Sequence, residues 1–134
     1  MKKLESGIEL LAEEVGVGPE AGPGDVVVYN WRIYLNRGDE VPLNERQLGD
    51  VPPDRRRTEA GQRFVDHRTR LGSRQVIAGV EKALLGMRAG GYRKVRVSPH
   101  LAYRERGLPD LIPENAVLVF ELWARTVEPS GARD

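Results

Sequence analysis

The chain has 134 residues, of which 40% are hydrophobic and 31% are charged, a balance that fits one globular domain with a modest core. Its 21 lysines and arginines nearly match its 20 acidic residues, so no overall charge predicts a nucleic-acid or anionic-membrane partner. The absence of cysteine excludes disulfides, thiol nucleophiles and thiolate metal sites.

The N-terminal residues 1–16 mix charged and apolar side chains. Glutamates interrupt every apolar run, so the segment lacks the hydrophobic core of a signal peptide. No stretch approaches the length of a membrane span either. We therefore expect a cytoplasmic protein without a membrane partner, in which residues 4–16 form an extended edge segment.

The first clear strand of the chain runs from Val26 to Leu35. It is rich in β-branched and aromatic residues, and its odd-numbered positions from 27 to 35 share one face. A glycine- and proline-rich run at residues 15–25 precedes it, and residues 36–39 close it as a turn.

An atypical segment follows at about residues 39–70, rich in proline and arginine. Prolines prevent regular structure in its first half, and residues 62–69 could form a short strand. Between positions 54 and 74, seven arginines stand against three acidic residues. The segment is either a basic patch for an anionic partner or a solvated surface excursion, and composition favours the excursion.

A helix is predicted from about Gln75 to Met87. Its apolar residues share one stripe at helical spacing: Val76, Val80, Ala83, Leu84 and Met87. The glycine pair at positions 90–91 would end it.

The remaining pattern is a strand at residues 92–97, a long loop at 98–113 and a last strand at 116–126. Strands dominate, and one helix is available to cover them. The predicted fold is therefore α+β, a twisted antiparallel sheet wrapped around a single α-helix, in one domain over residues 1–134.

The motifs of several enzyme classes are missing. There is no nucleophile elbow, P-loop or dinucleotide fingerprint. The two histidines, His67 and His100, have no ligand-like spacing to carboxylates, so no metal site is expected. An apolar pocket with a few polar groups remains possible. The residues that could line it are Val76, Ile77, Ile112 and Phe120. Periodicity alone favours the alternative, that these residues simply belong to the hydrophobic core.

Several runs in the second half of the chain nevertheless resemble, in residue type and spacing, the signature of FKBP-type peptidyl-prolyl isomerases. They read VIAGVE at 76–81, LLGMRAG at 84–90, VSPHLAY at 97–103, GLP at 107–109, IPENA at 112–116 and LVFEL at 118–122. With weaker matches upstream, the resemblance covers roughly residues 4–128.

The resemblance implies a twisted sheet around one helix and the cis–trans isomerisation of X-Pro bonds without a cofactor. The barrier to that rotation is roughly 18–20 kcal/mol and arises from amide resonance, so no nucleophile is required. The implied partners are proline-containing peptides and unfolded protein clients, with macrolide inhibitors as further candidate ligands.

The resemblance also assigns roles to seven positions. Tyr103 and Phe120 would be catalytic, and the binding residues would be Tyr29, Val76, Ile77, Val80 and Ile112. The backbone N–H of Ile77 and the hydroxyl of Tyr103 would donate hydrogen bonds to carbonyls of the bound peptide.

The chain departs from the family pattern in places. Val41 and Pro42 stand where the family usually has a Phe-Asp pair, so an aromatic wall and a carboxylate are missing. Val80 occupies a pocket floor that often carries a bulkier residue. Phe64 and His67 are candidates to replace the missing wall.

Two functions follow from this sequence. The first is a peptidyl-prolyl isomerase that assists protein folding with reduced activity. The alternative is a non-catalytic peptide- or protein-binding module that uses the arginine-rich segment. A nucleic-acid role is the least favoured, because acidic residues dilute the basic patch.

Overall fold

The computed structural model describes residues 2–5, 7–41, 56–59, 62–73, 76–101, 112 and 115–129. Their strands are β1 (Lys2–Glu5), β2 (Ile8–Glu14), β3 (Val26–Leu35), β4 (Glu40–Val41), β5 (Arg56–Glu59), β6 (Gln62–Val65), β7 (His67–Arg70), β8 (Tyr92–Val97) and β9 (Leu118–Glu128). The α-helix of this part of the chain is α2 (Ala78–Leu84), and a 3-10 turn spans Pro99–Leu101.

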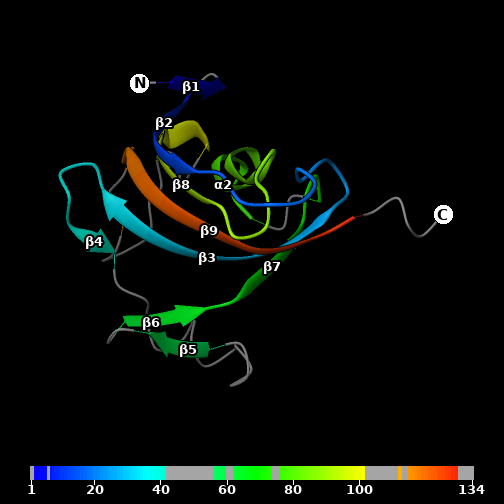
Figure 1. Ribbon diagram of the computed structural model, residues 1–134. Coiled ribbons are helices and arrows are strands. Elements are labelled where there is room, and N and C mark those ends of the chain that lie inside the picture. The colour runs from blue at the N-terminus through cyan, green and yellow to red at the C-terminus, as the bar shows by residue number, and fades with distance from the viewer. Residues whose placement is uncertain are drawn as a thin grey trace.

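All of these strands except β5 and β6 form one curved antiparallel sheet, in the order β1-β2-β8-β9-β3-β4 with β7 also paired to β3. The second edge of β3 is shared, because β7 pairs with its first half and β4 with its last residues. The sheet curls around α2, which lies on its concave face (Figure 1). This arrangement confirms the predicted α+β fold.

The alternation along β9 separates the two faces of the sheet. Leu118, Phe120 and Leu122 are fully buried and point toward α2. Glu121 and Trp123, which alternate with these residues, belong to the opposite, outer face and are only partly buried. The core therefore lies between the inner face and the helix.

A β-bulge reverses this alternation halfway along β2. Leu10 pairs with Val95 and Ala12 with Lys94, so Leu11 is an extra residue in the strand. Beyond the bulge, Glu13 is paired with Arg93, whose side chain faces inward. The extra residue thus turns a glutamate toward the inner face.

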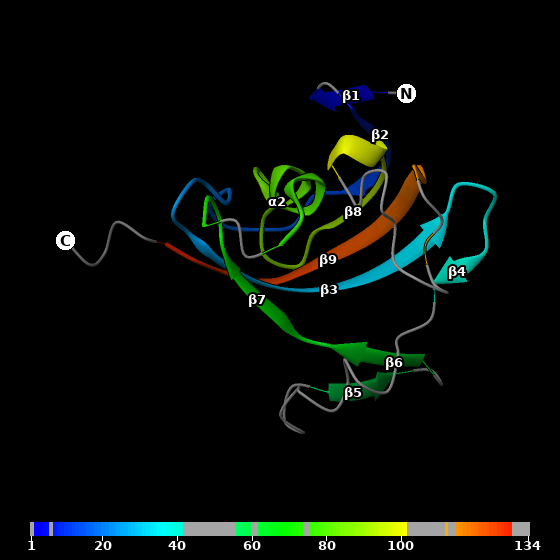
Figure 2. The ribbon, with the colours of Figure 1, turned by 180° about the vertical axis from the view of Figure 1, so that it is seen from behind.

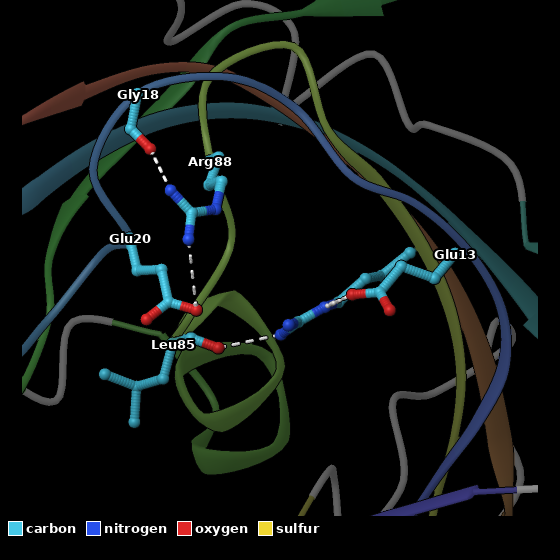
Figure 3. Close-up of polar contacts among 6 residues, drawn as sticks. Glu13, Gly18, Glu20, Leu85 and Arg88 are labelled. Carbon is cyan, nitrogen blue, oxygen red and sulfur yellow. Dashed lines mark hydrogen bonds and ion pairs between the residues drawn. The ribbon is translucent and has the colours of Figure 1, made fainter.

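Buried Arg93 makes use of that glutamate. Its guanidinium pairs with Glu13 at 2.9 Å and donates to the carbonyl of Leu85 at 2.7 Å (Figure 3). It also donates to the carbonyl of Ala83 at 2.8 Å. These carbonyls lie at the C-terminal end of α2, where backbone acceptors lack helical partners. A cation there also interacts favourably with the helix dipole.

A second arginine, Arg88, holds the loop that follows β2. It donates to the carbonyl of Gly18 and lies 3.8 Å from the carboxylate of Glu20 (Figure 3). These two contacts connect the turn after α2 to the loop before β3.

The predicted helix is too long at its C-terminal end, because α2 ends at Leu84 and not at Met87. Gly86 adopts a φ of +85°, and the N–H of Met87 bonds back to the carbonyl of Leu84. At the other end, Val76 and Ile77 are non-helical and precede the first turn.

Other boundaries also differ from the prediction. The N-terminal segment is a hairpin, with β1 at the edge and β2 inside the sheet. The segment 62–69 contains two strands, and β5 and β6 form a separate two-stranded sheet away from the main one (Figure 2). The last strand begins and ends two residues later than the predicted 116–126.

Candidate functional site

The inner face of the sheet carries a group of aromatic rings that lie in the hydrophobic core or pack against it. Phe120 of β9 is fully buried, and Trp31 of β3 is partly buried. Trp31 pairs with Leu122 and is therefore diagonal to Phe120 across the two strands. Their ring centroids lie 5.6 Å apart, within the range of a favourable aromatic contact.

His67, the first residue of β7, extends this group on the other side of β3. It pairs with Tyr29, and the two ring centroids are 5.5 Å apart. Its imidazole also meets the edge of Trp31, at 5.2 Å and 63°. Trp31 is therefore held between Phe120 and His67.

The N-terminal end of α2 adds a backbone donor at the edge of the same hydrophobic core. Ile77 is the N-cap, and its carbonyl accepts hydrogen bonds from the N–H groups of Val80 and Glu81. Within the described part of the chain, the N–H of Ile77 itself has no hydrogen-bond acceptor. Val76 and Ile77 are partly buried against the core, so an N–H group borders an apolar surface.

The structure brings most of the predicted site residues together. Four of them are buried in one hydrophobic cluster, with 0–4% of their surface exposed: Tyr29, Val80, Ile112 and Phe120. Val76 and Ile77 pack against that cluster. Tyr103, like Pro42, lies outside the described residues, so its role stays a prediction.

Trp31 was not among the predicted site residues, and His67 was named only as a candidate wall. Trp31 pairs with Leu122, two positions from Phe120 along β9, whereas Tyr29 pairs with Ala124, four positions from it. Trp31 therefore lies closer to Phe120 than Tyr29 does. The alternation of β3 already puts both rings on one face. His67 was only a candidate wall, since its place depends on a break between β6 and β7.

The described residues hold no group of three or more potential metal ligands, and none of their helices is long and apolar enough to cross a membrane. The site consists of apolar and aromatic side chains with a backbone donor at its border. Such a surface can bind an apolar segment and hydrogen-bond one carbonyl of it, but offers no nucleophile among these residues.

Comparison with known proteins gives a family match over residues 18–123. The matching family model is that of the FKBP-type peptidyl-prolyl cis-trans isomerases. The chain is 32% identical over 127 residues to the 46 kDa FK506-binding nuclear protein of Spodoptera frugiperda, and these cover 95% of the chain and 27% of that protein.

Other relatives agree. FK506-binding protein 4 of Chaetomium thermophilum is 38% identical over 120 residues, which are 90% of the chain and 21% of that protein. Peptidyl-prolyl cis-trans isomerase FKBP15-2 of Arabidopsis thaliana is 34% identical over 105 residues, 76% of the chain and 63% of that protein. The chain thus spans less than a third of the first two relatives.

Proposed function

Because the chain belongs to the family of FKBP-type peptidyl-prolyl cis-trans isomerases, we propose that it catalyses the cis–trans isomerisation of X-Pro bonds and so assists protein folding. Its substrates are proline-containing peptides and unfolded protein clients, and FK506-type macrolides are candidate inhibitors. A cytoplasmic location stays a prediction.

The observation that carries this proposal is the aromatic group beside a backbone donor. Trp31 is held between Phe120 and His67, and the N–H of Ile77 lies at the border of the same apolar surface. A proline ring can pack on these rings, while the N–H group binds a neighbouring carbonyl of the peptide. Fixing the chain on both sides of the X-Pro bond is what rotation about that bond requires.

An apolar surface also favours the transition state. The planar imide is polar because of its resonance, and twisting removes that resonance. Transfer from water to an apolar site therefore disfavours the planar form more than the twisted one. Each 1.4 kcal/mol of this difference accelerates rotation about tenfold.

We propose that the activity is lower than is usual for the family. Val41, at one position of the missing Phe-Asp pair, is an aliphatic residue buried in β4. His67 supplies an aromatic ring to the group, but its imidazole is smaller and more polar than the phenyl ring that the family usually has in the missing pair. Fewer apolar contacts with the proline mean less stabilisation of the twisted imide.

A protease-coupled isomerase assay with a proline-containing tetrapeptide tests the proposal. Trp31→Leu is expected to lower kcat/KM about tenfold or more, because it removes the ring between Phe120 and His67. Trp123→Leu is the matched control, since this tryptophan is also partly buried but lies on the outer face. A wild-type rate equal to the uncatalysed one, in folded protein, would reject the proposal.

Tyr103→Phe tests the role that the resemblance assigns to this hydroxyl. Loss of one hydrogen bond to a peptide carbonyl is expected to lower kcat/KM by roughly fivefold to tenfold. An unchanged kcat/KM would remove Tyr103 from the proposed site without touching the rest of it.

A second candidate function has one observation in its favour. The β5–β6 hairpin forms its own two-stranded sheet, separate from the strands that surround α2. A binding module would use this hairpin, whereas an isomerase would not need it. Replacing residues 56–65 with a short glycine-serine linker should then abolish partner capture while the rest of the domain stays folded, and unchanged capture would count against the binding module.

A further inference from the structure

The outer face of the sheet, turned away from α2, has a hollow of about 350 Å³. Its floor is Val119, which is only 7% exposed. Tyr34 of β3 and Arg96 of β8 flank that floor, since both pair with Val119 in register. The hollow thus lies across three neighbouring strands on the face opposite to the proposed catalytic site.

The bulge in β2 completes the apolar part of this hollow. The extra residue, Leu11, lines it, although neighbouring Leu10 is buried in the core. Leu35, at the end of β3, lines it from the opposite side. An aliphatic side chain placed in the hollow would therefore contact leucine or valine on several sides.

The carboxylate of Glu121 in the hollow already accepts two hydrogen bonds. Both oxygens of Glu121 accept hydrogen bonds from tyrosines, one from Tyr34 at 2.5 Å and one from Tyr92 at 2.6 Å. Arg96 is likewise engaged, with Glu9 at 3.1 Å and Asn36 at 3.0 Å.

The positive charge of Lys94 is not satisfied. Lys94 pairs with Glu121 along the strands and lines the hollow. Across the described residues, its ammonium group has neither a hydrogen bond nor an ion pair, while the two oxygens of Glu121 accept hydrogen bonds from the tyrosines. A ligand with a carboxylate would complement this cation.

The hollow continues past the end of β3. A second hollow of about 300 Å³ shares Leu35 and Asn36 with the first and is also lined by Arg37. Two adjoining hollows can hold successive side chains of one extended chain better than they can hold a single small molecule. The shape therefore favours a peptide.

We propose that this outer-face hollow is a second binding site, which takes an acidic peptide segment of a partner protein. A carboxylate of the peptide pairs with Lys94, and an aliphatic side chain next to it packs on Val119 and Leu11. The site does not depend on the isomerase activity, because it lies on the other face of the sheet.

The probe is a labelled, proline-free peptide of alternating leucine and glutamate with blocked ends, titrated against the full chain by fluorescence anisotropy. Saturable binding is expected. Lys94→Gln should weaken binding about tenfold, the scale of one charge-assisted hydrogen bond. Leu11→Asp should weaken it at least as much, because it adds a negative charge to the apolar wall.

Arg125→Gln is the matched control, since it removes one exposed positive charge from β9 at a distance from the hollow. It should leave the affinity unchanged, and the same peptide with glutamine for glutamate should bind at least tenfold more weakly. Amide shifts in an NMR titration should map to Lys94 and Val119.

Three results would overturn the proposal. The first is no saturable binding to the acidic peptide, and the second is an equal loss of affinity in Lys94→Gln and Arg125→Gln. The third is a set of amide shifts at Val76 and Ile77, which would place the peptide at the inner face.

Discussion

Among single residues, Arg93 of β8 connects two other elements, β2 and the C-terminal end of α2. It is 9% exposed, binds two carbonyls at the end of α2 and pairs with Glu13. Arg93→Met leaves those acceptors and the carboxylate without their donor. We expect the free energy of unfolding, measured by urea denaturation, to fall by about 3 kcal/mol.

Two further variants test the origin of that loss. Arg125→Met, at an exposed position, should change stability by less than about 0.5 kcal/mol. In the double variant of Arg93→Met and Glu13→Gln, the loss should be smaller than the sum of the single losses, because the two side chains share an ion pair. Additive losses would show that the pair is not coupled.

The tyrosines on the outer face make stability depend on pH. Burial raises the pKa of Tyr34 and of Tyr92, and their hydrogen bonds to Glu121 raise it further. In the unfolded chain a tyrosine loses its proton near pH 10. The unfolded state then binds fewer protons than the folded state, so this contribution is complete below about pH 10 and is lost as the pH rises further.

Urea midpoints at pH 8 and pH 11 measure this effect. The wild-type midpoint should fall between the two values. In the double variant Tyr34→Phe and Tyr92→Phe it should fall less, since no phenol remains there to ionise. Equal falls in both proteins would assign the alkaline loss to other groups.

The burial of the apolar members of the candidate site could be predicted from the sequence, because helical spacing and strand alternation mark inner-face residues. Phe120 and Val80 are where an inner-face residue should be. The neighbours of Trp31 were harder to predict. They depend on which residue of β9 pairs with which residue of β3. They also depend on His67, which is 36 positions after Trp31 in the chain and lies beside its ring.

Among the elements, α2 depends on a close approach to the sheet at Gly79. A Cβ atom added there would lie 2.5 Å from a methyl group of Val97 and 2.8 Å from the carbonyl oxygen of Leu101. Alanine in a helix is usually more stable than glycine by about 1 kcal/mol. Here we expect the opposite sign, a loss of about 1–3 kcal/mol from overpacking.

Thermal unfolding of Gly79→Ala followed by circular dichroism checks this sign. Ala78→Gly is a useful comparison at an exposed neighbouring position, where only the helix propensity changes. It should cost no more than about 1 kcal/mol. A higher melting temperature for Gly79→Ala would contradict the close packing of α2 on β8.

The boundaries of β3 and β8 follow from their own residues, and both were predicted to the residue. The end of α2 does not follow from its own residues. Its apolar stripe continues to Met87, but Arg93 of β8 binds the last carbonyls and Gly86 turns the chain away. A local glycine turn and a contact from another element therefore act together where the helix ends.

For the whole molecule, composition and periodicity predicted the fold class but not the order of the strands. The sheet places β8 and β9 between β2 and β3, so neighbours in the sheet are distant in the sequence. Nothing in the local pattern of a strand specifies such a partner. The resemblance to a known family implied the twisted sheet around one helix, and the family match agrees with that fold but the strand order was not predicted.

This strand order has a consequence for how fast the protein folds. Tyr34 of β3 and Glu121 of β9 are hydrogen-bonded in the native state but stand 87 residues apart in the chain. Contacts at that separation form late, because a long loop must close before any of them can contribute energy. Folding by stopped-flow tryptophan fluorescence should therefore take milliseconds to seconds, the range of domains whose contacts are mainly non-local.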